Sequence, residues 1–255
     1  MRRSIVILLI TCLTILLGTS GAYAERKVAL VIGNSDYQRI AGVGTASADA
    51  SLLAETFRKS GFDEVTLRQN LTLSTMSDAL TEFAVKANAS DVAVFCYMGH
   101  GVELGGAQFL LPVDAALARD FDLPNEGISL NRVLGALKGA GRLRLVIVGA
   151  SRDNTIAASM TRSTGSAASD QDQVNLPPNQ DTVLAFASTA GHPALNAADG
   201  HSQFAIALAK FIGKPGVDLR RVLGMVRDEV MQSTNHRQSP YVYGVIKAEN
   251  LELIR

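Results

Sequence analysis

Four short apolar runs, each about the length of one strand, constrain the fold of this chain most. They cover residues 27–33, 91–97, 144–148 and 182–186, and the first ends in glycine. Nearly continuous apolar runs of this length are typical of strands buried on both faces of a parallel sheet. The stretches between them carry apolar residues at helical spacing. The alternation predicts an α/β fold with a mainly parallel central sheet flanked by helices.

Weaker patterns complete the expected elements. We predict further strands at 64–67 and 241–245 and a hairpin arm at 108–111, and we predict helices at 47–60, 74–89, 130–137, 203–212 and 219–231.

Length and charge limit the classes of protein to consider. The 255 residues are 47% hydrophobic and 19% charged, which suits one large domain with a substantial core. Lys and Arg together number 24, as do Asp and Glu, so no basic excess indicates a nucleic-acid partner. The pattern indicates no particular oligomeric state.

The first 24 residues have the pattern of a secretory signal peptide. Two arginines precede an apolar run from Ile5 to Leu17, and Ala22-Tyr23-Ala24 has the small-x-small form of a cleavage site. An uncleaved membrane anchor is the alternative, but the run is short of the ~20 residues that a span needs. We therefore expect a periplasmic or secreted protein that starts near Glu25 and keeps no membrane span.

The expected mature chain, 25–255, reads as a single domain with one polar insertion. Residues 161–180 are rich in Ser, Thr, Asp, Asn, Gln and Pro, which predicts a flexible loop between a larger and a smaller part of that domain. Cleavage of the leader leaves Cys96 as the only cysteine, so no internal disulfide is expected.

Reactive side chains follow two of the buried strands. His100, flanked by Gly99 and Gly101, follows the strand at 91–97, and Ser151 follows the strand at 144–148. Ligands bind outside the carboxyl ends of strands in open α/β sheets. If the two strands are neighbours, His100 and Ser151 face one crevice.

These strand ends belong to a series of motifs that resembles one family. The stretch Tyr97-Met98-Gly99-His100-Gly101 resembles the histidine motif of caspase-like peptidases, particularly of the bacterial metacaspase type. Similar segments of that family correspond, in the same order, to residues 29–37, 109–114, 145–154 and 199–204. The resemblance extends over about residues 26–245 and implies a caspase-haemoglobinase-like fold.

The resemblance also implies roles for individual residues. The family consists of cysteine endopeptidases, in which His100 would be the general base or acid and the backbone N–H groups of Gly101 and residue 151 would bind the oxyanion. Ser151 stands at the position of the nucleophilic cysteine. Gly149 stands where the family has an aspartate that helps to bind a basic substrate side chain.

The two departures favour a pseudo-peptidase that binds a peptide or protein ligand or acts as a regulatory module. Serine needs a well-oriented base, and no acid in the sequence is assigned to orient His100. A working hydrolase with a Ser151–His100 dyad is the alternative, and a vestigial crevice beside another functional surface is a third. Cys96 lies about 13 Å along the strand from His100 at ~3.3 Å per residue, and we expect it to be a small buried hydrophobe.

No cofactor is expected. One cysteine without paired metal-ligand spacing indicates no metal site, and the sequence has no loop of regularly spaced carboxylates that would predict a calcium site.

Overall fold

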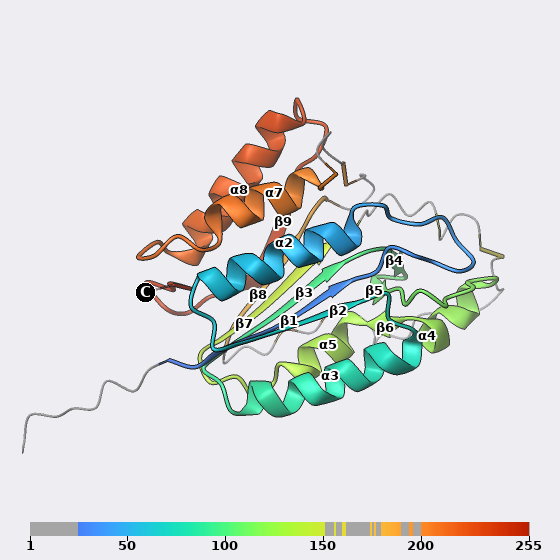
Figure 1. Ribbon diagram of the computed structural model, residues 1–255, viewed down its shortest axis with the longest axis horizontal. Helices are drawn as coiled ribbons and strands as arrows, with labels where there is room; N and C mark the ends of the chain where they lie inside the picture. Colours follow the sequence, from blue (N-terminus) through green and yellow to red (C-terminus); the bar gives the residue numbers. More distant parts are fainter. Residues whose placement is uncertain are drawn as a thin grey trace, which may run out of the picture.

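The chain forms a twisted sheet between two layers of helices. The computed structural model describes residues 25–150, 156, 160–161, 174, 176, 180–189, 194–195 and 200–254. Its six-stranded sheet has the order β2-β1-β3-β7-β8-β9. Figure 1 shows the helices α2, α7 and α8 on one side of this sheet and α3 and α5 on the other.

Five strands of the large sheet are parallel, and β9 runs antiparallel to β8. The bounds are β1 (Lys27–Gly33), β2 (Glu64–Gln69), β3 (Val92–Met98), β7 (Leu143–Gly149), β8 (Asp181–Phe186) and β9 (Tyr241–Val245). The central strands are buried along nearly their whole length, as their apolar composition predicts. The prediction of a mainly parallel α/β sheet is confirmed.

The helices begin and end within two residues of their predicted positions. They are α2 (Ala46–Lys59), α3 (Leu73–Asn88), α5 (Leu130–Ala136), α7 (Gln203–Phe211) and α8 (Leu219–Ser233). Side chains of Thr72, Ser129, Ser202 and Asp218 accept a backbone N–H in the first turn of α3, α5, α7 and α8. Such N-caps fix where a helix begins because they satisfy an otherwise unpaired donor.

A small antiparallel sheet lies beyond the carboxyl ends of the large one. It contains β4 (Gly101–Leu104), β5 (Ala107–Leu110) and β6 (Ile128–Ser129). The sequence pattern predicts only an arm at 108–111 in this region. The short helices η1 (Asp120–Asp122) and α4 (Leu123–Glu126) are not predicted. Elements of two to four residues carry too few side chains for a recognisable period.

Each face of the sheet has its own core, and β3 contributes to both. Cys96 and Met98 pack with α2, α7 and α8, whereas Phe95 and Tyr97 pack with α3 and α5. This alternation is the two-residue period of a strand. The last residues of β3 therefore contact the helices of both layers in alternation.

Two expectations fall largely or wholly outside the described residues. The leader at 1–24 is not described, and most of the loop at 161–180 is not, so the proposed domain limits stay predictions. Within the described residues, no helix has both the length and the hydropathy that a membrane span requires.

Candidate functional site

The carboxyl ends of β3 and β7 lie side by side. The two strands pair in parallel over their full length, and Met98 is the register partner of Gly149. The strands that lead to His100 and to residue 151 are thus neighbours, as a shared crevice for these two residues requires. His100 is described, whereas Ser151 lies outside the described residues, so its role as nucleophile stays a prediction.

Two tyrosines hold the backbone of His100. The His100 N–H donates to Tyr37 Oη at 2.8 Å, and Tyr97 Oη lies 2.9 Å from the carbonyl oxygen of His100. The two hydroxyls are 2.9 Å apart, and both lie within hydrogen-bonding distance of the Leu111 carbonyl, at 3.2 Å from Tyr37 and 2.8 Å from Tyr97. The histidine backbone is therefore fixed on both its donor and its acceptor side.

Burial keeps these hydroxyls protonated. It raises the pKa of Tyr37 to about 12, although hydrogen bonds with Tyr97 and His100 act in the opposite direction. It also raises the pKa of Tyr97 well above its usual value, helped by the neighbouring Tyr37. Neutral hydroxyls can both donate and accept, which the network around His100 requires.

Gly99 is a glycine because the hydroxyls occupy the space beside it. A Cβ at position 99 would lie 2.5 Å from Tyr97 Oη and 2.7 Å from Tyr37 Oη. Any side chain there would displace one of the groups that hold His100.

A backbone carbonyl orients the His100 ring. Nε2 lies 2.7 Å from the carbonyl oxygen of Ala41, and the Tyr37 ring packs on the imidazole with 4.7 Å between centroids. A carbonyl oxygen only accepts, so Nε2 carries a proton, and Nδ1 holds the lone pair when the ring is neutral. From the sequence, an acid is the group expected in this role. The group found is a backbone carbonyl 59 residues away, for which no side-chain pattern gives a signal.

The end of β7 is packed closely against its neighbours. Ala150 is 2% exposed, and a Cβ at Gly101 would lie 3.2 Å from Ala150 Cβ. Gly101 therefore allows the start of β4 to approach the last described residue of this segment. The oxyanion role of Gly101 and residue 151 stays a prediction.

Cys96 is a buried core residue. It is free and fully buried, and burial together with the charge of Asp49 raises the pKa of its thiol. A thiol that resists ionisation is a poor nucleophile. The interpretation of Cys96 as a small buried hydrophobe is confirmed.

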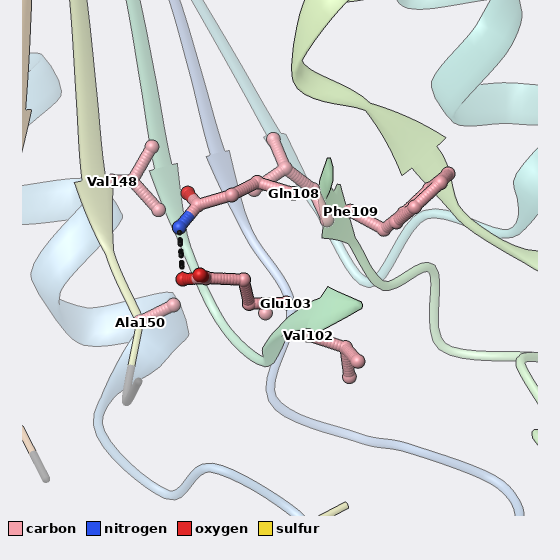
Figure 2. A pocket seen from close by; sticks show the side chains of 8 residues that line it. Val102, Glu103, Gln108, Phe109, Val148 and Ala150 are labelled. Carbon is pink, nitrogen blue, oxygen red and sulfur yellow. Dashed lines mark hydrogen bonds between the residues drawn. The ribbon is translucent and has the colours of Figure 1, made fainter. Parts of the chain in front are cut away.

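A small pocket lies between the end of β7 and the β4–β5 hairpin. Figure 2 shows the side chains of Glu103 and Gln108 meeting above it, with a hydrogen bond of 3.0 Å between them. Its volume of about 10 Å³ gives room for about one water molecule. The lining residues are Gly101, Val102, Glu103, Gln108, Phe109, Leu110, Val148 and Ala150.

An acid–histidine contact joins two helices on one face of the sheet. His201 Nδ1 is 3.1 Å from Asp49 Oδ1, and the same oxygen accepts the Ser202 N–H at 3.0 Å. This contact joins α2 to the start of α7. Among the described residues, no three His, Cys, Asp or Glu side chains gather as metal ligands would.

Comparison with known proteins assigns the family. The model of the caspase domain (Peptidase C14) matches residues 26–250. This chain belongs to the caspase-domain family. It is therefore a protein of a peptidase family, and its α/β sheet is that family's fold.

Named relatives agree with the assignment. The chain is 34% identical over 97 residues to human mucosa-associated lymphoid tissue lymphoma translocation protein 1 and equally to its mouse homologue. The match spans 38% of this chain but only 12% of each relative's length. Protein GSU0716 from Geobacter sulfurreducens has the same fold, with a TM-score of 0.65 and 14% identity, over 90% of this chain and 97% of that one.

Proposed function

We propose that this protein is an exported caspase-domain pseudo-peptidase, which binds a peptide or protein segment at the ends of β3 and β7 without cleaving it. The carrying observation is Ser151, at the position that the family resemblance assigns to the nucleophilic cysteine, after a strand that pairs with the one leading to His100. The held backbone and oriented ring of His100 support a preserved cleft. The protein then acts as a binding or regulatory module.

The chemistry of the nucleophile supports the absence of cleavage. A cysteine is a few per cent thiolate near neutral pH, whereas a serine hydroxyl needs a base that is itself stabilised. In serine hydrolases a carboxylate stabilises the imidazolium that forms. Here Nε2 of His100 contacts the neutral Ala41 carbonyl, which offers a dipole instead of a full charge. We expect a rate several orders of magnitude below that of a cysteine enzyme.

One observation favours a second function, a hydrolase with a Ser151–His100 dyad. Because Nε2 donates to the Ala41 carbonyl, Nδ1 is the ring nitrogen that would accept the serine proton in such a dyad. A serine-directed fluorophosphonate probe tests this alternative. Labelling of the wild type that disappears in Ser151→Ala supports the dyad, and a wild type that resists labelling supports the pseudo-peptidase.

Hydrolysis assays test the main proposal directly. A panel of fluorogenic peptides with varied residues before the scissile bond is given to mature wild type, Ser151→Ala and Ser151→Cys. We expect no turnover by wild type or the alanine variant and measurable turnover by the cysteine variant. Turnover by wild type that vanishes in Ser151→Ala would refute the proposal. If the cysteine variant also shows no turnover, the site has lost more than its nucleophile.

Export is part of the proposal and has its own test. The leader pattern at 1–24 supports cleavage before Glu25 and a periplasmic or secreted location. Expression of the full sequence with a C-terminal tag in a Gram-negative host, followed by N-terminal sequencing of the periplasmic fraction, should give a chain starting near Glu25. An intact N-terminus in the membrane or cytoplasmic fraction would contradict export.

A further inference from the structure

A groove lies between α8 and the edge strand β9, and none of its lining residues belongs to the site around His100. Its volume of about 350 Å³ is in the range of small-ligand sites. The walls are mainly apolar, two arginines also line them, and no described lining residue is acidic. The lining residues are Arg220, Leu223, Gly224 and Arg227 of α8, with Pro240, Tyr241, Val242 and Ile246 in and beside β9.

Gly224 keeps the α8 side of the groove open. It lies in the middle of α8, it is partly exposed, and no described atom lies within 4 Å of its Cβ position. Glycine in a helix interior is less stable than alanine, and no packing contact in the described part of the chain requires it here. The missing side chain does leave room for a group from outside to approach the helix backbone.

The strand β9 is an unprotected edge of the large sheet. Among the described strands it pairs with β8 alone, and its five residues carry no charge. Tyr241, Val242 and Tyr243 are 43%, 40% and 46% exposed. Edge strands usually carry charges, prolines or bulges that prevent pairing with another chain. Because β9 has none of these along its length, its outer N–H and C=O groups can pair with a further strand.

Arg220 gives the groove a planar cation whose position is fixed. Its Nε and one Nη donate to the two carboxylate oxygens of Asp218, at 2.9 and 2.7 Å. The same Nη also lies 3.3 Å from the Ala248 carbonyl oxygen and 2.7 Å from that of Glu249. These contacts use the N–H groups around the guanidinium and leave its faces, on which aromatic rings stack. An aromatic side chain therefore suits this groove better than a carboxylate does.

We propose that this groove binds an extended segment of another protein, which adds a strand to β9 and places an aromatic side chain against Arg220 and the apolar wall. Strand addition supplies backbone hydrogen bonds, and a groove that receives one side chain supplies selectivity. The site lies apart from the proposed cleft at β3 and β7, so this inference does not depend on the proposed function.

A second copy of this chain fits the groove less well than an aromatic segment does. On the sheet face that α8 covers, β9 carries only Val242 and Gly244, because their register partners Ala185 and Val183 belong to the core on that face. A copy paired edge to edge would offer a valine and a glycine to a volume of about 350 Å³. An aromatic ring fills more of that volume.

Binding of two dye-labelled peptides to the mature chain tests the proposal. Both peptides alternate threonine and valine, and they differ only in a central tryptophan or a central lysine. In fluorescence polarisation, we expect wild type to bind the tryptophan peptide at least ~10-fold more tightly than the lysine peptide. Equal affinities, or no binding of either peptide, would overturn the proposal.

The variant Gly224→Leu fills the groove and leaves the fold intact. Leucine is a better helix former than glycine, so the urea midpoint should rise, whereas the affinity for the tryptophan peptide should fall at least ~10-fold. Gly135→Leu in α5 is the matched control, because the Cβ position of this glycine is also open. It should raise the midpoint and keep the wild-type affinity. Wild-type binding by Gly224→Leu would show that the peptide does not occupy the groove.

Analytical ultracentrifugation distinguishes a foreign segment from a second copy. We expect the mature chain to stay monomeric over a concentration series, with β9 free for the peptide. A dimer that Val242→Lys dissociates would show that a second copy occupies this edge, and it would overturn the proposal.

Discussion

The ends of β3 and β7 lie next to each other but differ in the kind of contact that surrounds them. Beyond β3, the backbone of His100 is held by the hydroxyls of Tyr37 and Tyr97, and its ring by the Ala41 carbonyl. Beside Gly149 at the end of β7, the neighbouring group is the Met98 thioether. The first end is a polar network, buried at the hydroxyl of Tyr97 and exposed at the contact with Ala41, whereas the second is an apolar contact.

The two kinds of contact differ in how well they tolerate a substitution. A buried network tolerates no missing partner, because an unsatisfied polar group costs about 1–3 kcal/mol. An apolar contact tolerates changes of side chain if the volume is kept. The groups that orient His100 are thus the part that resists substitution, and the neighbouring strand end is the part that tolerates another apolar side chain of similar volume.

The largest expected effect follows from filling the space beside Gly99. Gly99→Ala puts a Cβ within 2.7 Å of both tyrosine hydroxyls, so the network around His100 must open. We expect the free energy of unfolding to fall by about 3 kcal/mol in urea titrations. Gly135→Ala is the control, because nothing lies within 4 Å of its Cβ position and alanine favours a helix, so it should stabilise by ~0.5–1 kcal/mol. Equal effects of the two changes would contradict the network.

A smaller loss is expected when one hydroxyl is removed without adding volume. Tyr97→Phe deletes the hydroxyl that lies 2.9 Å from the His100 carbonyl and 2.8 Å from that of Leu111. We expect a loss of about 1 kcal/mol in urea unfolding, because one hydrogen bond is lost while Leu111 N–H still donates to the His100 carbonyl and Asn34 Nδ2 to the Leu111 carbonyl. Phe83→Leu, on the same face of the sheet, changes only apolar packing and serves as the comparison. In the Tyr97 variant, NMR of the His100 backbone amide should change, and in the Phe83 variant it should not.

The fold followed from the sequence better than the site did. Buried parallel strands are apolar on both faces, so β1, β3, β7 and β8 show in the sequence as runs. His100 was found because it directly follows such a run. The groups that contact His100 were not predicted. Tyr37 is 63 residues away in the sequence, and the Ala41 group is a backbone carbonyl, which every residue has. Partners of this kind depend on tertiary structure and leave no local pattern.

The contribution of Met98 was missed for a related reason. In the sequence it is one apolar residue among seven in β3. Only the register with β7 places its thioether beside Gly149. The family resemblance implies an acid at that position, and the structure shows that the Met98 side chain fills the volume beside Gly149.

Alkaline pH should weaken the tyrosine network before the rest of the core. An unfolded tyrosine titrates near pH 10, whereas burial raises the pKa of Tyr37 to about 12 in the folded chain. The folded state therefore holds a proton that the unfolded state loses, and stability present below pH 10 declines as pH rises towards 12. We expect each such tyrosine to contribute a slope of up to ~1.4 kcal/mol per pH unit. Urea unfolding of Tyr37→Phe between about pH 9 and 11 should show a shallower decline than wild type, and an identical slope would refute the assignment.

The smallest effect is expected in the hairpin that flanks β7. Glu103 and Gln108 form a half-buried cross-strand pair between β4 and β5, where water reaches part of each side chain. A double-mutant cycle of Glu103→Ala and Gln108→Ala should give a coupling of about 0.2–1 kcal/mol in urea unfolding. Glu82→Ala in α3, an exposed acid outside the hairpin, should add to Gln108→Ala without coupling. A hairpin coupling above that range would mean that this side of β7 also holds a demanding polar network, and the contrast between the two strand ends would then be confined to the Met98 face.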